Sequence, residues 1–293
     1  MNGAVSIVII GRNEERGVEK CVRAAQTAAQ IGGAEIIYVD SASTDDTVRI
    51  VESLGIRVVA LDPNQKLCPS AGRFAGSRAA NGEFILFLDA DTLIYEDFLP
   101  AAVEHFRCHP PVAGINGRID DTDESGVLFA DVGDRFDEIA EIEWLRGPAC
   151  FYRRAALIAA GSFNPQLLVE EEAELGLRLL KNGWRLNLLP VPMACHTRCY
   201  HNQTFASLLN SLRRDLATGR IGEVISTMLC AFRQGFGWKF CRLRLKTTLF
   251  FVVWLMSCAA CVFLPLFLYP SVIFTLVVVL GAIAVWYKKR DLY

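Results

Sequence analysis

The residues of this chain best suited to chemistry are two aspartates separated by one alanine, Asp89 and Asp91. They directly follow an apolar run over residues 84–88, which favours a buried strand that ends where the carboxylates begin. Two carboxylates so placed can hold a hard divalent cation, and such a cation can neutralise a leaving diphosphate. An isolated Asp-x-Asp also occurs as a solvated acidic turn, so the neighbouring elements decide between the two interpretations.

The elements that would position these aspartates alternate along the first third of the chain. Short apolar runs and helical patterns take turns there, which is typical of βαβ units on a mostly parallel sheet. We expect strands over 5–10, 35–39, 57–61 and 84–88, and helices over 15–31, 44–54 and 71–80. Ser43 is placed to cap the second of these helices. Open α/β sheets form their ligand crevice at the carboxyl ends of the strands, where the two aspartates stand.

The pattern weakens over residues 97–143. We expect the glycine-rich, acidic stretch 114–133 to be loop and short strand around a substrate. A helix over 171–182, ended by Gly183, and a strand over 185–191 follow. Two amphipathic helices come next, which would either lie on a membrane surface or pack against the preceding domain.

Three segments stand out for their order along the chain: Val-Ser-Ile-Val-Ile-Ile-Gly-Arg-Asn-Glu-Glu over 5–15, Val-Asp-Ser-Ala-Ser-Thr-Asp over 39–45 and Leu-Phe-Leu-Asp-Ala-Asp over 86–91. Together they resemble the inverting glycosyltransferases of family 2. The resemblance covers about the first two hundred residues and implies the GT-A fold, a single α/β domain around a nucleotide-binding half. Ile10 stands where the family has proline, and Phe74 where it has asparagine.

The resemblance also assigns roles to residues near the expected crevice. Asp91 would contact Mg²⁺ or Mn²⁺ directly, while Asp89 would reach the ribose or a metal-bound water. Arg73 would touch the nucleotide base or a phosphate, and Asp40 would recognise uridine or guanosine as well as take part in a capping turn with Ser43 and Asp45. His196, just after a strand, could complete the metal site or bind phosphate. The full set expected to bind the nucleotide-sugar is Asn13, Glu14, Asp40, Ser43, Arg73 and Asp89.

An acceptor hydroxyl needs a general base opposite the leaving diphosphate. In the family this base lies in a Glu-Asp-x-Asp-Leu segment that opens a helix, and Glu-Glu-Ala-Glu-Leu over 171–175 matches it. The match makes Glu172 the base, with Glu171 or Glu170 as its alternatives. Glutamate in place of aspartate lengthens the side chain by one methylene, which is the reason to keep the alternatives. We expect Glu174 to form a surface pair with Arg178.

The charge of the chain is unevenly distributed. The formal net charge is -2, yet 12 basic and 3 acidic residues lie from Arg198 onward. Residues 247–287 contain no charged side chain. As one helix they would be roughly 60 Å long against a hydrocarbon core of about 30 Å, so we expect a hairpin of two transmembrane or re-entrant helices. Basic residues on both flanks predict that both ends lie in the cytoplasm. A basic segment suits nucleic acid or lipid, and the neighbouring uncharged run favours lipid as the anionic partner.

These observations predict three parts: a catalytic domain over 1–202, amphipathic juxtamembrane helices over 203–246 and the hairpin over 247–287. Without a signal peptide, the catalytic domain would be cytosolic at the inner membrane, and the ten cysteines would stay reduced. The resemblance implies an inverting, hexosyltransferase-type enzyme that takes a sugar from a UDP- or GDP-linked donor, and the membrane hairpin predicts a lipid-linked acceptor. The acceptor would be a polyprenyl phosphate, a polyprenyl-diphosphate sugar or a glycolipid.

Two alternatives compete with this function. One is a degenerate, non-catalytic membrane scaffold or sugar-nucleotide-binding protein, which the intact acids at 89, 91 and 172 disfavour. The other is a sugar-nucleotide pyrophosphorylase. That enzyme would carry a glycine-rich phosphate loop with a basic residue after the first strand, where this chain has Gly-Arg-Asn-Glu over 11–14.

Overall fold

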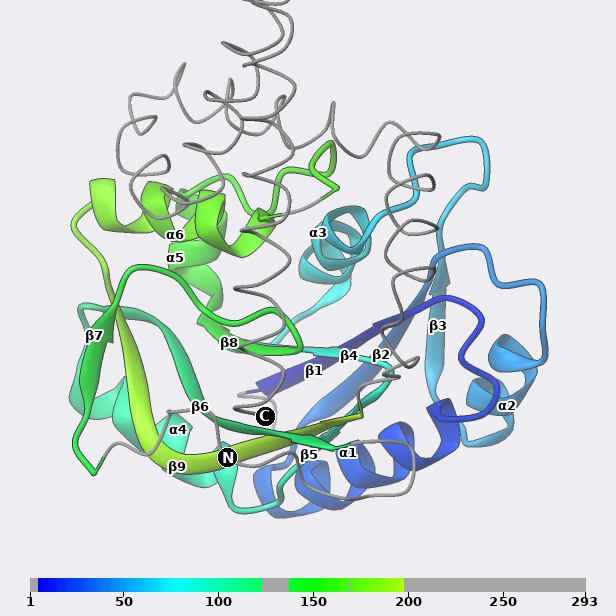
Figure 1. Ribbon diagram of the computed structural model, residues 1–293, viewed down its shortest axis with the longest axis horizontal. Coiled ribbons are helices and arrows are strands. Elements are labelled where there is room, and N and C mark those ends of the chain that lie inside the picture. Colours follow the sequence, from blue (N-terminus) through cyan, green and yellow to red (C-terminus); the bar gives the residue numbers. More distant parts are fainter. Residues whose placement is uncertain (1–4, 123–136, 169, 198–293) are drawn as a thin grey trace, which may run out of the picture. The chain divides into compact units, whose positions relative to one another are not determined.

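The computed structural model describes residues 5–122, 137–168 and 170–197 (Figure 1). All of them belong to the first of two compact units, Met1–Thr227 and Met228–Tyr293. The helices of the described part are α1 Val18–Gly32, α2 Thr47–Ser53, α3 Pro69–Ala79, α4 Phe98–Cys108, α5 Arg154–Ala159 and α6 Glu171–Lys181. The strands are β1 Val5–Gly11, β2 Glu35–Asp40, β3 Arg57–Ala60, β4 Phe84–Asp89, β5 Thr92–Ile94, β6 Val112–Thr122, β7 Ala140–Ile142, β8 Ala149–Arg153 and β9 Arg185–Thr197.

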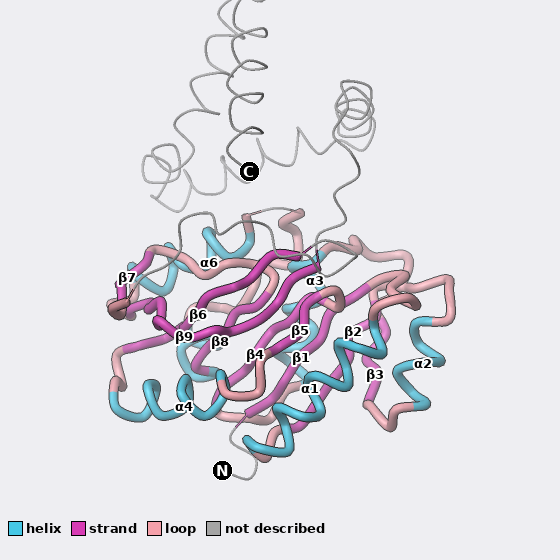
Figure 2. Tube along the Cα trace, turned by 60° about the horizontal axis from the view of Figure 1, so that its bottom comes forward, coloured by secondary structure: helices cyan, strands magenta, loops and turns pink. Residues whose placement is uncertain are grey.

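These strands form one twisted sheet in the order β3-β2-β1-β4-β8-β6-β9-β5, with β7 also paired to β9 (Figure 2). The four strands β3, β2, β1 and β4 are parallel. Gly11 of β1 lies beside Asp40 of β2, and Ile10 lies beside Asp89 of β4. Three strands therefore end side by side at one edge, which is where ligands of open α/β sheets bind.

The other half of the sheet mixes strand directions. Strand β8 runs antiparallel to both β4 and β6, while β6 and β9 are parallel to each other with shifts in their register. Strands β5 and β7 pair antiparallel with β9. This half brings residues from the end of β6 and the end of β9 toward the segment that follows β4.

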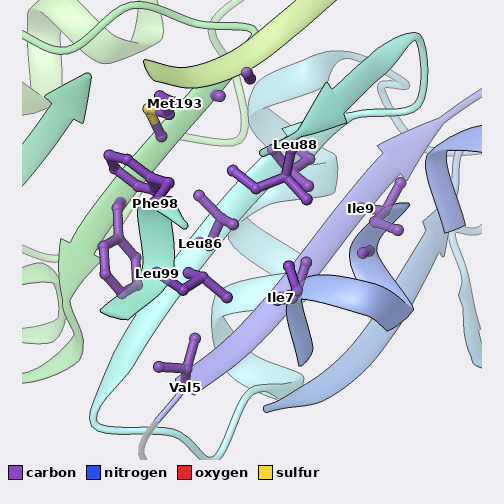
Figure 3. Packing of buried hydrophobic residues seen from close by; sticks show 14 of the residues in the cluster. Val5, Ile7, Ile9, Leu86, Leu88, Phe98, Leu99 and Met193 are labelled. Carbon is purple, nitrogen blue, oxygen red and sulfur yellow. The ribbon is translucent and has the colours of Figure 1, made fainter. Parts of the chain in front are cut away.

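The sheet is buried on both faces, which explains why β1, apart from Ser6, and β4 up to Asp89 consist of apolar residues. Helices α1 and α4 cover one face, and α3, α5 and α6 cover the other (Figure 1). On the first face Val5, Ile7 and Ile9 of β1 join Leu86 of β4 and Phe98 of α4 in one apolar cluster (Figure 3). The alternate residues of β1 belong to the cluster on the second face.

The expected fold class needs correction. We predicted a mostly parallel sheet followed by a transmembrane hairpin, but the sheet is mixed because β5, β7 and β8 are antiparallel to their neighbours. No helix in the described part of the chain is long and apolar enough to cross a membrane. The segment assigned to the hairpin, 247–287, and the juxtamembrane helices assigned to 203–246 lie outside the described residues.

Several element boundaries also differ from expectation. Helix α2 begins at Thr47 with Asp46 at its N-cap position, so Ser43 does not cap it. Strand β9 runs to Thr197, well past the predicted end, because it pairs with three other strands. The described part of the stretch expected to be loop and short strand, residues 114–122, belongs to the long strand β6.

Candidate active site

A pocket of about 280 Å³ opens at the edge where β1, β2 and β4 end. The loop after β1 supplies one wall, the segment after β4 supplies another, and the start of α3 closes the third side. Its lining residues are Ile10, Gly11, Arg12, Glu14, Ser41, Leu67, Cys68, Pro69, Asp89, Ala90 and Asp91. The predicted residues Glu14, Asp89 and Asp91 are thus brought together. The sequence analysis did not assign Arg12 to the site, although this cation lines the same pocket. Its position within the segment 5–15 could have indicated it.

Side chains bind the loop after β1 to the loop after β2. The backbone N–H of Asn13 donates to Ser43 Oγ at 2.9 Å, and the N–H of Thr44 donates to Asn13 Oδ1 at 2.8 Å. The carboxylate of Asp40 accepts from the N–H and the hydroxyl of Ser43 at 2.9 and 2.5 Å. These hydrogen bonds therefore fix the shape of the two loops. None of Asn13, Asp40 and Ser43 is among the residues that line the pocket.

Two of these loop residues adopt left-handed backbone conformations. Asn13 and Ala42 both have φ of 58°, a region that alanine rarely occupies and asparagine tolerates better. Strain of this kind persists only where the surroundings enforce it, and here the hydrogen bonds between the loops do so. The rim of the pocket is consequently held in one conformation.

The pocket wall carries more negative than positive charge. Burial raises the pKa of Glu14 to about 7, and the negative charges around it, first that of Asp91, add to the rise. Burial also raises the pKa of Asp89 to about 6, although the guanidinium of Arg73 opposes that change. Carboxyl groups that raise one another's pKa are stabilised in their charged form when a cation binds among them.

His196, on β9, lies beside this wall. Its Nε2 is 3.4 Å from Asp91 Oδ2, and its Nδ1 is 3.0 Å from Oδ1 of Asp121 on β6. Burial alone would lower the pKa of His196, but its hydrogen bonds and charge interactions with the two aspartates raise it. The prediction placed His196 near Asp91 but missed Asp121, which reaches the histidine only through the pairing of β6 with β9.

The donor atoms of this region fit a divalent cation as part of its ligand set. Among the described residues, no group of three or more His, Cys, Asp or Glu side chains could hold a metal ion. Asp91 nevertheless lines the pocket, and Nε2 of His196 lies 3.4 Å from its Oδ2. Mg²⁺ is usually bound by one or two carboxylates together with water and substrate phosphates, so such a partial set suits an ion shared with a diphosphate.

Arg73 lies in a different place from the one expected. Its side chain is 2% exposed, so it does not line the pocket as a contact for a base or phosphate. Instead Nη2 donates to Asp89 Oδ1 at 2.9 Å and to the carbonyl of Gly147 at 2.8 Å. Nη1 donates to Glu171 Oε1 at 2.6 Å and lies 3.1 Å from Glu172 Oε1.

The two candidate bases open helix α6 beside this arginine. Glu170, at the N-cap position, has φ of 62°, which turns the chain sharply into the helix. The Glu172 side chain is 13% exposed, and burial raises its pKa to about 7, opposed by Arg73 and reinforced by Glu171. Glu171 is more deeply buried and makes the shorter contact with Arg73. The raised pKa of Glu172 suits it to accept a proton near neutral pH.

The pair between Glu174 and Arg178 is confirmed, but its expected place on the surface is wrong. Both carboxylate oxygens of Glu174 accept from Arg178, at 2.8 and 2.7 Å, and the Glu174 side chain is only 2% exposed. Arg178 also donates to the carbonyls of Ala160 and Ser162. This pair therefore anchors α6 to the segment after α5 and is separate from the pocket.

Comparison with known proteins agrees with the motifs at these positions. The model of "Glycosyl transferase family 2" matches residues 6–148, and that of "Glycosyl transferase family group 2" matches residues 84–288. The chain belongs to glycosyl transferase family 2. The matches of this family 2 protein include both the Asp89–Asp91 segment and, in the second case, the start of α6.

Curated relatives of the family 2 protein differ in what their names say they act on. A pre-mycofactocin glycosyltransferase of Mycobacterium tuberculosis is 26% identical over 209 residues, 66% of this chain and 42% of the relative. Poly(ribitol-phosphate) beta-N-acetylglucosaminyltransferase TarS of Staphylococcus aureus is 28% identical over 170 residues, 53% of this chain and 28% of the relative. An undecaprenyl-phosphate 4-deoxy-4-formamido-L-arabinose transferase of Klebsiella pneumoniae is 32% identical over 106 residues, 34% of this chain and 32% of the relative. The chain thus matches less than half the length of each.

Solved structures share the fold. Staphylococcus aureus TarS 1–349 in complex with UDP-GlcNAc has a TM-score of 0.56 at 22% identity, covering 69% of this chain and 60% of that one. GalNAc-T7 with UDP, GalNAc and Mn²⁺ has a TM-score of 0.54 at 16% identity, covering 67% and 44%. These likenesses support the GT-A-like α/β domain expected from the motifs.

Proposed function

We propose that the protein is an inverting, metal-dependent glycosyltransferase that takes a sugar from a UDP-linked donor. One observation carries the proposal: Arg73 contacts both Asp89, in the wall of the acidic pocket, and Glu172, the carboxylate suited to act as a base. The guanidinium of Arg73 thus links the proposed donor site, at Asp89, to the proposed proton acceptor, Glu172. The UDP and UDP-GlcNAc complexes of TarS favour uridine over guanosine in the donor.

In this proposal the loops after β1 and β2 bind the nucleoside, and Asp89 and Asp91 face the diphosphate. A divalent cation bound by Asp91 and His196, Mg²⁺ or Mn²⁺, would supply neutralisation of the leaving group's charge. Glu172 takes the proton of the acceptor hydroxyl while that oxygen forms a bond to the anomeric carbon. The bond from the same carbon to the UDP oxygen breaks on the opposite face, which inverts the configuration.

The acceptor that we propose is linked to a lipid at the cytoplasmic face of a membrane. Two observations support it: the name of the Klebsiella relative specifies undecaprenyl phosphate, and basic residues outnumber acidic ones 12 to 3 from Arg198 onward. Basic segments are attracted to anionic lipid headgroups at a membrane surface. The protein would then bind the acceptor at the membrane surface, where the phosphate of the acceptor lies.

The test is turnover by the purified full chain. UDP- and GDP-sugars are incubated with bacterial lipid extract or with water-soluble sugars, in Mn²⁺ or in EDTA, and nucleotide release and transfer of label are measured. We expect UDP release that requires the metal, and label in the lipid phase. Donor binding without turnover, in every combination, would support the non-catalytic alternative. Transfer only to water-soluble sugars would overturn the lipid acceptor.

A further inference from the structure

Arg73 makes more contacts with acids than a buried arginine needs. Two of its nitrogens contact three carboxylates and one carbonyl, all between 2.6 and 3.1 Å, while its side chain is almost fully buried. The Glu171 and Glu172 side chains are largely buried and that of Asp89 is 32% exposed, and one guanidinium cannot balance the charges of three carboxylates when all are ionised. An arrangement with such an electrostatic cost requires a reason beyond stability.

The partners of Arg73 come from three separate elements. Asp89 ends β4 and lines the pocket, Gly147 lies in the loop before β8, and Glu171 and Glu172 open α6. The guanidinium is planar and its donors have a fixed fork geometry, so groups bound to it hold fixed positions relative to one another. Arg73 therefore sets the distance between the donor side of the site and the start of α6.

Arg178 provides a comparison within the same fold. It is also largely buried, and it also pairs with a glutamate of α6, but its one carboxylate partner, Glu174, balances its charge. Neither Arg178 nor Glu174 lines the pocket. Arg178 shows how this protein anchors α6 for stability, and Arg73 departs from that arrangement by contacting the acids to which the reaction is assigned.

We propose that Arg73 is a positioning residue that fixes the base Glu172 relative to the donor-side carboxylate Asp89. The inference rests on the proposed function and adds a residue that acts through others, since Arg73 itself does not reach the pocket. Lysine at this position would keep the positive charge, but its single ammonium group cannot hold the groups that the planar guanidinium binds in their fixed relative positions. In a folded Arg73→Lys variant, the base Glu172 would therefore be present but displaced from its position relative to Asp89.

The first experiment is a double-mutant cycle with a matched control. Single-turnover sugar transfer from UDP-GlcNAc is measured for wild type, Arg73→Lys, Glu172→Gln, the double variant and Arg178→Lys, with thermal melting of each. We expect Arg73→Lys to slow transfer about a hundredfold, the cost of misplacing a reacting group by an ångström. Adding it to Glu172→Gln should cost less than about threefold more, because residues that act as a unit are not additive.

The control and the contrary results are equally specific. Arg178→Lys should lower the melting temperature and leave the rate per folded molecule unchanged. If the effects of Arg73→Lys and Glu172→Gln multiply, or if Arg178→Lys slows transfer as much as Arg73→Lys does, Arg73 is only structural and the inference is wrong.

A second variant covers the case in which Arg73→Lys does not fold. A Cβ at Gly147 would come within 2.8 Å of Glu172 Oε1, which sits at the end of a flexible side chain that can shift. Gly147→Ala should therefore displace the base without unfolding the chain and slow transfer about tenfold to a hundredfold. Unchanged transfer by a folded Gly147→Ala would overturn the inference.

Failure of the proposed function is distinguishable from failure of this inference. If wild type transfers no sugar from UDP-GlcNAc or from the other UDP- and GDP-sugars, the proposed function fails. Arg73 is then judged by UDP binding in the presence of Mn²⁺, measured by calorimetry. Weaker binding in Arg73→Lys but not in Arg178→Lys would still support a link from Arg73 to Asp89, and equal affinity in both would refute it.

Discussion

At the scale of single residues, the site depends on how burial changes the acids. Asp89, Glu14 and Glu172 all have pKa values raised by burial, and each lies near other negative charge. Their neighbours differ: Glu172 shares Arg73 with Glu171, whereas Glu14 lines the pocket beside Asp91. The same residue type therefore stands in two different settings, and we propose a base at Glu172 and part of a cation-binding wall at Glu14.

Replacement of Glu172 by glutamine tests the base. The amide keeps the shape of the side chain but cannot take a proton, so we expect transfer to slow about a hundredfold to ten-thousandfold. Donor affinity should stay nearly unchanged, because the proton moves only as the acceptor attacks. Donor dissociation constants and single-turnover rates measure both. If Glu171→Gln is inactive and Glu172→Gln is active, the base is Glu171.

The pH dependence of transfer follows from the pKa of about 7 at Glu172. A general base works as the carboxylate, and its raised pKa leaves it protonated at pH 6. The rate should therefore rise with pH, by about tenfold per unit below 7, and level off above it. Single-turnover rates between pH 5.5 and 8.5 test this, and the residual rate of Glu172→Gln should lack that rise.

Replacement of Asp91 by alanine tests the metal. The Asp91 side chain is 40% exposed and His196 keeps its contact with Asp121, so we expect stability to change by only about 0.5 kcal/mol. The dependence of UDP binding on Mn²⁺ should disappear. Calorimetry with Mn²⁺ and with EDTA measures it, and Glu52→Ala, at an exposed acid of α2, is the control. Full activity of Asp91→Ala in EDTA would contradict a metal-dependent reaction.

At the scale of elements, α6 has two attachments with different purposes. Its first turn contacts Arg73 at the site, and one turn further on Glu174 and Arg178 bind it to the segment after α5. The second attachment keeps the helix in place while the first aligns its acids. Separate attachments allow stability and catalysis to be changed independently.

Glu174→Gln should therefore affect stability and spare chemistry. It leaves the largely buried guanidinium of Arg178 without a balancing charge, which costs about 3 kcal/mol when one partner of a buried pair is removed. A surface pair would have cost less than about 0.5 kcal/mol. Urea denaturation measures the difference, and transfer per folded molecule should match wild type. A decrease in the free energy of unfolding smaller than about 0.5 kcal/mol would show that the Glu174–Arg178 pair contributes little to stability.

At the scale of the whole molecule, the uneven charge of the chain predicts its location. The excess of basic residues from Arg198 onward should bind the full chain to vesicles containing anionic phospholipid. Near-surface Lys or Arg residues contribute about 1 kcal/mol each to such binding. Cosedimentation should weaken as salt rises and when Lys288, Lys289 and Arg290 are changed to glutamine. Equal binding to neutral and anionic vesicles would contradict this location.

The sequence by itself determined the parallel half of the sheet and the place of its acids. Strands β1, β2 and β4 are buried on both faces, so their apolar runs are continuous and end visibly at polar residues such as Asp40 and Asp89. Helix α6 was equally evident, because the acids in its first turn and the glycine that follows it, Gly183, are local signals. Patterns of this kind extend over a few neighbouring residues and are therefore readable along the chain.

Only the tertiary structure decided which of these acids meet. Arg73 lies 16 residues from Asp89 and 98 from Glu171 in the sequence, and Asp121 lies 75 from His196. No periodicity links such distant positions, because the pairing of β6, β8 and β9 and the docking of α6 create their proximity. Burial of the Glu174 pair has the same origin. The sequence thus named most of the acids of the site, while packing between distant segments gave these acids their partners and raised the pKa of Asp89 and of Glu172.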